Sequence, residues 1–171
     1  MADNDSFPAR EALDPREFRR ALGRFPTGVT VVTTRTADGN PVGLTANSFS
    51  SVSLDPPLVL FSLGHTAASL DAFMRAEFFA VNVLGSHQRH LSNRFASQGV
   101  EKYQGVEYQD GLGGAPVLLD SIACFECSVH DRVLAGDHTI FLGRVERMTH
   151  REGEPLLYSG GQYAVPGRMP D

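Results

Sequence analysis

Basic residues are scarce in this chain of 171 residues. Lysine and arginine together number 15 against 20 aspartates and glutamates, and the net charge is −5. A groove for nucleic acid needs a basic face, so this composition argues against a nucleic-acid partner. The sequence also lacks any apolar run of about 18 residues, the length that a membrane-spanning helix needs, and we expect no membrane association.

Cysteine is nearly absent, with only Cys124 and Cys127. A secreted domain more often carries several cysteine pairs, so this number agrees with a reducing compartment. Residues 1–10 are polar and acidic instead of basic and then apolar, which does not fit a secretory signal peptide. A cytoplasmic location is therefore expected.

Several signatures of catalytic or metal sites are missing or incomplete. The chain has no G-x-S-x-G motif, which speaks against an α/β-hydrolase. The lone C-x-x-C pair lies in a predicted strand, where its odd spacing sends the two side chains to opposite faces. Residues 111–114 (GLGG) lack the preceding strand and the following helix of a dinucleotide-binding loop. His87 and His90 have no cysteine or carboxylate near them in the sequence, so we expect no metal site.

The chain length predicts one domain, which we place at residues 13–165. A flexible leader at residues 1–12 and a C-terminal tail at residues 166–171 are expected on either side. Asp14 and Pro15 are typical of a helix start, and Gly23 is typical of a helix end. Runs of β-branched and apolar residues predict strands. The expected strands cover residues 29–34, 41–46, 58–63, 78–84, 117–119, 122–134 and 139–149, and two more short helices cover 67–75 and 86–95.

Turn signals join most of these strands as hairpins. Residues 38–40 (DGN) are a hairpin turn, and residues 135–137 join the two long strands. The run over 58–63 is apolar and predicts a buried strand, while residues 96–114 form a long loop of the kind that covers a site. This order of elements favours a closed or half-closed antiparallel barrel over a doubly wound parallel sheet.

The segment from Gly43 to Ser53 is rich in small polar side chains and lies between two apolar strands. Hydroxyl groups and unpaired backbone N–H groups at a strand end can hold phosphate oxygens without a glycine-rich loop. The alternative is that these residues only make turns and local side-chain-to-backbone hydrogen bonds.

Several blocks of this sequence resemble the flavin reductase-like family, which includes the small reductase components of two-component flavin monooxygenases. The blocks are TGVTVVT (27–33), GLTANSFSSVSLDPPL (43–58), FAVNVL (79–84), SNRF (92–95), GDHTIFLGRV (136–145), PLLY (155–158) and GQY (161–163). They follow in order over nearly the whole chain from Phe18 to Tyr163. The resemblance implies a mainly β, antiparallel FMN-binding split barrel with short helices. It also implies a homodimer with flavin at or near the subunit interface.

The resemblance further implies which residues contact FMN or FAD. These are Thr45, Ala46, Asn47, Ser48, Ser50, Ser51, Ser62, Leu63, Thr66, Asn82, Val83, Leu84, Arg94 and Phe95. The first four would lie along the isoalloxazine, and Ser50 and Ser51 would meet the ribityl chain or phosphate. Arg94 is the expected cation for a phosphate, with a solvated helix face as the alternative interpretation.

His138 is the expected catalytic residue, because the family associates this position with the nicotinamide pocket. Tyr158 is expected on the same side of the site. Asp137 could orient the imidazole, although adjacent side chains on a strand point to opposite faces. The alternative is that His138 is only a histidine at a turn or sheet edge.

The implied activity is reduction of FMN or FAD by NADH or NADPH, with the reduced flavin passed to a separate monooxygenase component. Hydride transfer between the two cofactors needs the protein mainly to stack and orient their rings, which agrees with the lack of an acid–base pair. Two alternatives are a non-catalytic flavin-binding carrier or sensor, and a flavin-dependent reductase of another acceptor such as a corrinoid. The sequence does not choose between FMN and FAD, between NADH and NADPH, or between flavin as substrate and as prosthetic group.

Overall fold

The chain folds mainly into antiparallel strands, and the computed structural model describes residues 13–167. The strands are β1 (Thr27–Gly28), β2 (Thr30–Arg35), β3 (Pro41–Ala46), β4 (Ser50–Leu54), β5 (Pro57–Gly64), β6 (Phe78–Val83), β7 (Tyr108–Asp110), β8 (Pro116–Leu118), β9 (Ala123–Ala135), β10 (His138–His150), β11 (Leu157–Ser159) and β12 (Gln162–Ala164). The helices are α1 (Pro15–Leu22), α2 (Leu70–Arg75) and α3 (Arg89–Ala96), with 3-10 helices η1 (Ser86–Gln88) and η2 (Leu112–Gly114). The predicted mainly β, antiparallel fold with short helices is confirmed.

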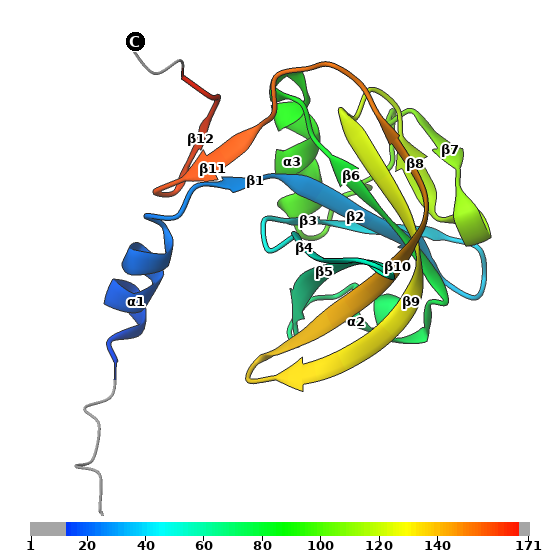
Figure 1. The fold of residues 1–171 in the computed structure, drawn as a ribbon, viewed down its shortest axis with the longest axis horizontal. Helices are drawn as coiled ribbons and strands as arrows, with labels where there is room; N and C mark the ends of the chain where they lie inside the picture. The colour runs from blue at the N-terminus through cyan, green and yellow to red at the C-terminus, as the bar shows by residue number, and fades with distance from the viewer. Residues whose placement is uncertain (1–12, 168–171) are drawn as a thin grey trace, which may run out of the picture.

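The main sheet has seven strands in the order β3-β2-β6-β9-β10-β5-β4 (Figure 1). Its two edge strands, β3 and β4, follow each other in the chain and are joined only by residues 47–49. Three linking residues span at most about 14 Å, so the sheet has to curl until its edges come together. Ser48 fixes this approach, because its Oγ accepts a hydrogen bond from the Ser62 amide on β5 at 2.9 Å. We call this junction of β3, β4 and β5 the seam.

Phenylalanine rings fill the inside of the curled sheet. Phe61 lies at the centre, with ring centroids 5.0 Å from Phe141, 5.2 Å from Phe79 and 5.5 Å from Phe73. On β5 only alternate residues are buried, so Val59, Phe61 and Leu63 face the core while the residues between them face outward. The expectation of a strand buried throughout is therefore wrong for the single chain, in which β5 has one covered face.

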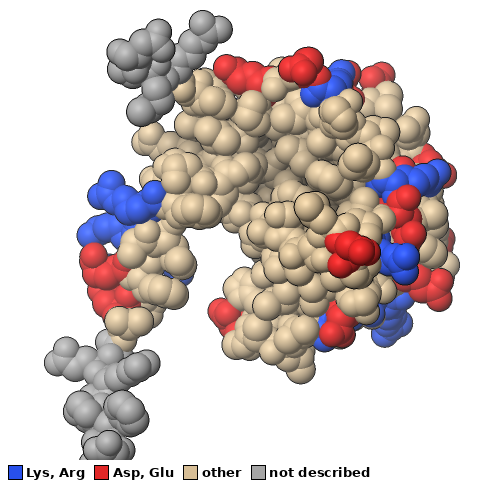
Figure 2. Space-filling model, viewed as in Figure 1, with Lys and Arg blue, Asp and Glu red and all other residues tan. Residues whose placement is uncertain are grey.

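Helix α1 projects from the barrel as an arm (Figure 1). It begins as predicted, since the Asp14 side chain accepts a hydrogen bond from the Arg16 amide at 2.8 Å. All eight residues of the helix are exposed, including Phe18 and Leu22. Figure 2 shows a notch between this arm and the barrel whose walls are mostly uncharged, while blue arginines lie on the outer side of the arm.

The predicted long loop over residues 96–114 contains β7 and η2 and is attached to β3. Lys102 Nζ donates to the Gly43 carbonyl at 3.1 Å and to the Phe95 carbonyl at 2.8 Å. Tyr103 donates to the Val42 carbonyl at 2.9 Å. Burial lowers the pKa of Lys102. These contacts hold the loop against the first edge of the main sheet.

Within residues 13–167, no helix is long and apolar enough to cross a bilayer. The same part of the chain contains no group of three or more histidine, cysteine or acidic side chains placed to hold a metal ion. The expected leader at residues 1–12 and most of the expected tail lie outside the described residues.

Candidate functional site at the barrel seam

The seam leaves polar groups without partners inside the described chain. Within residues 13–167, the backbone N–H groups of residues 47–49 donate no hydrogen bond to another backbone group. Asn47 is exposed, and its side-chain amide forms no hydrogen bond within residues 13–167. These amides lie where two sheet edges meet, and unpaired backbone groups at a sheet edge are ready to bind another molecule.

Side-chain hydrogen bonds fix Thr45, just before this group of donors, and Ser48 within it. Thr45 Oγ1 donates to the Ser92 carbonyl of α3 at 2.6 Å. Ser48 Oγ both accepts from the Ser62 amide and donates to the Ser62 carbonyl, the latter at 3.2 Å. The structure therefore joins the predicted residues Ser48 and Ser62, whereas Thr45 is bonded to α3.

A pocket of about 180 Å³ opens beside Thr45 and Asn47. Its other walls come from β1–β2, α3 and the C-terminal hairpin, and they are Val29, Ser92, Ala96, Tyr158 and Tyr163. An apolar cavity of about 150 Å³ accommodates a benzene ring, so this pocket has the size for one aromatic ring. The structure thus places the predicted Tyr158 beside the predicted Thr45 and Asn47.

Tyr163 was not expected among the site residues, yet it holds the C-terminal hairpin on α3. Its hydroxyl lies 2.8 Å from Ser92 Oγ and donates to Asn93 Oδ1 at 2.9 Å. Arg89 stacks over its ring at 5.0 Å, and Tyr158 meets it edge to face at 5.5 Å. The glycine pair at 160–161 between the two tyrosines is a hairpin signal that would have pointed to this contact.

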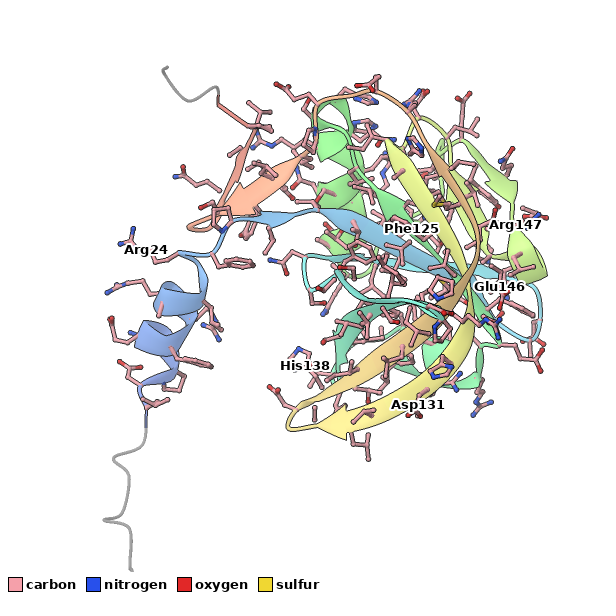
Figure 3. All side chains as sticks on the ribbon, in the orientation of Figure 1. Arg24, Phe125, Asp131, His138, Glu146 and Arg147 are labelled. Carbon is pink, nitrogen blue, oxygen red and sulfur yellow. The ribbon has the colours of Figure 1, made fainter. Side chains whose placement is uncertain are left out.

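His138 lies on the outer side of the same barrel wall. It pairs with Gly64 across β10 and β5, and Ile140 pairs with Ser62. Residues two apart on a strand share a face, so His138 and Gly64 share the outer face with Ser62, about 7 Å along the strand. Figure 3 shows the His138 side chain on the side of the hairpin toward the notch.

Five predicted contact residues are buried: Ala46, Leu63, Asn82, Leu84 and Phe95. Asn82 uses its side chain internally, since Nδ2 donates to the Val31 carbonyl at 3.1 Å and Oδ1 accepts from the Leu118 amide at 2.8 Å. A ligand on the surface would meet such positions only through backbone atoms. Val83 is half-buried next to them.

The remaining predicted residues lie at or near the surface. Ser50, Ser51 and Thr66 are exposed. Arg94 is half-buried on α3, and its Nη1 donates to the Gln104 carbonyl of the attached loop. A guanidinium has five N–H donors, so this bond leaves Arg94 others for an anion.

The polar groups at the seam match the chemical groups of a flavin. A flavin presents a flat ring with one hydrogen-bonding edge and an anionic phosphate, and amides with hydroxyls are suited to both. Among residues 13–167, the buried Thr27 Oγ1 has no hydrogen-bond partner, and Thr27 pairs with Tyr158 at the edge of this region. The residues present therefore fit a flavin, and the arrangement defines a nucleotide-binding antiparallel barrel.

Comparison with known proteins identifies the particular family. Residues 22–166 match the model of the flavin reductase like domain. The chain belongs to this family, and the resemblance inferred from the sequence is confirmed.

Relatives extend over most of the chain. The FMN reductase (NADH) SmoA of Agrobacterium fabrum is 48% identical over 86% of this chain and 84% of its own length. The reductase subunit HsaB of a flavin-dependent monooxygenase from Rhodococcus jostii is 43% identical over 98% of this chain and 85% of its own. A relative from Rhizobium meliloti is 44% identical over 91% of this chain, which spans only 50% of that protein. The predicted class, an oxidoreductase of the flavin reductase type, is confirmed.

A solved structure agrees with the fold. The NADH:FAD oxidoreductase SgcE6 of Streptomyces globisporus, in complex with NAD and FAD fragments, superposes with a TM-score of 0.86. It is 40% identical, and the match covers 95% of this chain and 100% of the other.

Proposed function

We propose that this protein uses NADH or NADPH to reduce FMN or FAD at the seam and passes the reduced flavin to a separate monooxygenase component. The observation that carries the proposal is that Ser48 of the seam is hydrogen-bonded to Ser62, and that Ser62 and His138 share the outer face of the β5–β10 wall. Flavin and nicotinamide must lie face to face for hydride transfer, so both binding regions have to adjoin.

Each part of the flavin has candidate partners on this face. Backbone amides of Thr45, Ala46, Asn47 and Ser48 would bind the polar edge of the ring. The hydroxyls of Ser50, Ser51 and Thr66, together with Arg94, would bind the ribityl chain and phosphate. Ser62 positions Ser48 by the two hydrogen bonds between them. Backbone atoms of the buried residues named above would complete the wall.

The bound flavin would supply the hydride acceptor and the bound nicotinamide the donor. The chain's own task is to orient the rings, exclude water and place N–H donors near the flavin edge that becomes negatively charged on reduction. His138 and Tyr158 would hold the nicotinamide from two sides. They lie on different elements, β10 and β11.

A second copy of the chain would close the notch. Leu54 on β4 is 95% exposed and Phe25 after α1 is 75% exposed, and both are large apolar side chains. Exposed apolar surface next to a polar site is typical of a protein interface. A homodimer would bury these side chains and enclose the flavin between subunits.

The test is oxidation of NADH or NADPH by the purified chain with added FMN or FAD, followed at the absorbance of the reduced nicotinamide. We expect turnover well above the rate with free flavin alone. In the His138→Ala variant, kcat/KM for the nicotinamide should fall about 10- to 100-fold, because a misplaced ring loses its reactive geometry. The flavin Kd, measured by fluorescence quenching, should change little.

Two outcomes would contradict the proposal. Flavin binding without nicotinamide oxidation would indicate a carrier or sensor. An equal loss of flavin affinity in His138→Ala would place His138 in the flavin site instead of the nicotinamide site.

A further inference from the structure

The imidazole of His138 has a fixed partner in its own turn. His138 Nδ1 lies 2.7 Å from Asp137 Oδ1. Regular strand geometry would send these neighbours to opposite faces, but Asp137 precedes β10 and belongs to the turn after Gly136, whose φ is +61°. Because Asp137 lies in the turn and not in the strand, its side chain and that of His138 point to the same side.

An ionised carboxylate decides which ring nitrogen carries the proton. Asp137 is fully exposed, and its hydrogen bond with His138 lowers the pKa of this carboxyl. A carboxylate only accepts hydrogen bonds, so Nδ1 has to donate. In the neutral imidazole the proton is then on Nδ1, and Nε2 presents a lone pair.

The surroundings hold this arrangement in place on the outer face. The Asp137 carbonyl accepts a hydrogen bond from the His65 amide at 2.9 Å. His65 Nε2 lies 3.2 Å from Thr139 Oγ1, which joins the segment after β5 to β10 a second time. A Cβ on Gly64 would lie 3.5 Å from His138 Nε2, so the ring lies across β5 above a residue with no side chain.

We infer that Asp137 is a positioning residue that holds His138 with its proton on Nδ1, so that Nε2 accepts an N–H of the carboxamide of the reduced nicotinamide. This inference rests on the proposed function. It goes further by naming the part of the substrate that the protein recognises, the carboxamide of the nicotinamide. A site built to accept an N–H discriminates against an analogue that lacks it.

The experiment compares NADH with its reduced 3-acetylpyridine analogue, in which a methyl group replaces the carboxamide nitrogen. The measured quantity is the ratio of kcat/KM for the two donors, with the same flavin throughout. In His138→Ala and Asp137→Ala this preference should fall about tenfold relative to the unmodified protein, the range expected for one hydrogen bond. Asp137→Asn keeps an acceptor oxygen, so its preference for NADH should lie between that of the unmodified protein and that of Asp137→Ala.

Asp131→Asn is the matched control, because it removes one carboxylate from the same β9–β10 hairpin on the side away from His138 (Figure 3). Its preference should equal that of the unmodified protein. Nitrogen-15 NMR of the histidine rings, with His138 assigned through His138→Ala, gives a second measurement. We expect the proton of His138 on Nδ1, and a mixture of the two neutral forms in Asp137→Ala.

Different results would contradict the carboxamide recognition, the fixed proton on His138 and the proposed function. An unchanged donor preference in Asp137→Ala would refute the positioning of His138 for the carboxamide, while NADH oxidation would still support the proposed function. The same NMR pattern with and without Asp137 would show that the carboxylate does not fix the ring. Absence of any NADH oxidation would refute the proposed function and carboxamide recognition together.

Discussion

Cys124 and Cys127 illustrate how burial controls chemistry at the scale of one residue. Both lie in β9 as free thiols, and they belong to different parts of the core, as their odd spacing predicts. Burial raises the pKa of each thiol to about 12, from 9.0. Because the thiolate is the reactive form, both cysteines should be inert in the folded protein.

We therefore expect iodoacetamide at pH 8 to alkylate the native chain at least about tenfold more slowly than the unfolded chain, because the raised pKa lowers the thiolate fraction and burial limits access of the reagent. Mass spectrometry of quenched samples measures the two rates. The raised pKa also has a consequence for stability: the contribution of the thiols is complete below pH 9 and is lost as the pH rises toward 12. Rapid alkylation of the native chain would contradict the observed burial.

Strand β10 shows how an element depends on one missing side chain. A Cβ on Gly143 would lie 2.3 Å from Cζ of Phe79 and 2.9 Å from Cβ of Cys127. The pairing of β10 with β9 shifts its register between Leu142 and Gly143. The glycine thus lets β10 pass close to the phenylalanine core.

Gly143→Ala should lower the free energy of unfolding by about 1–3 kcal/mol, the usual cost of overpacking a well-packed core. Urea denaturation followed by circular dichroism measures the change. Gly28→Ala in β1 is the control, because a Cβ there meets no atom within 4 Å. Equal stability of Gly143→Ala and Gly28→Ala would show that the core rearranges to accommodate a methyl group at position 143.

The elements that the sequence predicted are those with long β-branched or apolar runs. The hairpin of β2 and β3 formed around Gly39, and β9 and β10 formed a pair, because both strands and turns carried clear local signals. Strands β1, β4, β7, β11 and β12 were not predicted. All of these strands are short. Strand β4 (Ser50–Leu54) is also mostly polar, so its pairing with β5 makes it a strand, and its local propensity does not.

In the candidate site, too, the sequence showed the local features but not the contacts between distant elements. The polar stretch around Thr45–Ser48 was visible in the sequence because its side chains are unusual between two apolar strands. The internal role of Asn82 and the contact of Tyr163 with Ser92 were not visible, since each joins elements distant in the chain. Residue type alone does not distinguish a buried amide that binds backbone from one that faces a ligand.

At the scale of the whole molecule, the arm is the feature that a single chain does not explain. Phe18, Leu22 and Phe25 recur at helical spacing and lie exposed, at 53%, 58% and 75%. A helix whose apolar stripe faces solvent lacks the packing that stabilises most helices in proteins. Association with a second copy would provide that packing.

Leu22→Glu should shift the protein from dimer to monomer, because it places a charge in the apolar stripe. Sedimentation velocity at micromolar concentration measures the change, and flavin affinity should fall with it. Arg16→Glu on the opposite face of α1 is the control and should remain dimeric. A monomeric unmodified protein, or a dimeric Leu22→Glu variant, would contradict an interface on this stripe.

The three residues between β3 and β4 both close the sheet and carry the unpaired amides. An added residue in that connection would widen the barrel and displace the unpaired amides at once, so the segment has little freedom to change length. Diversification of what such a barrel accepts would therefore arise in its attachments, namely the arm, the C-terminal hairpin and the loop held by Lys102. For engineering new specificity, those attachments are the place to begin.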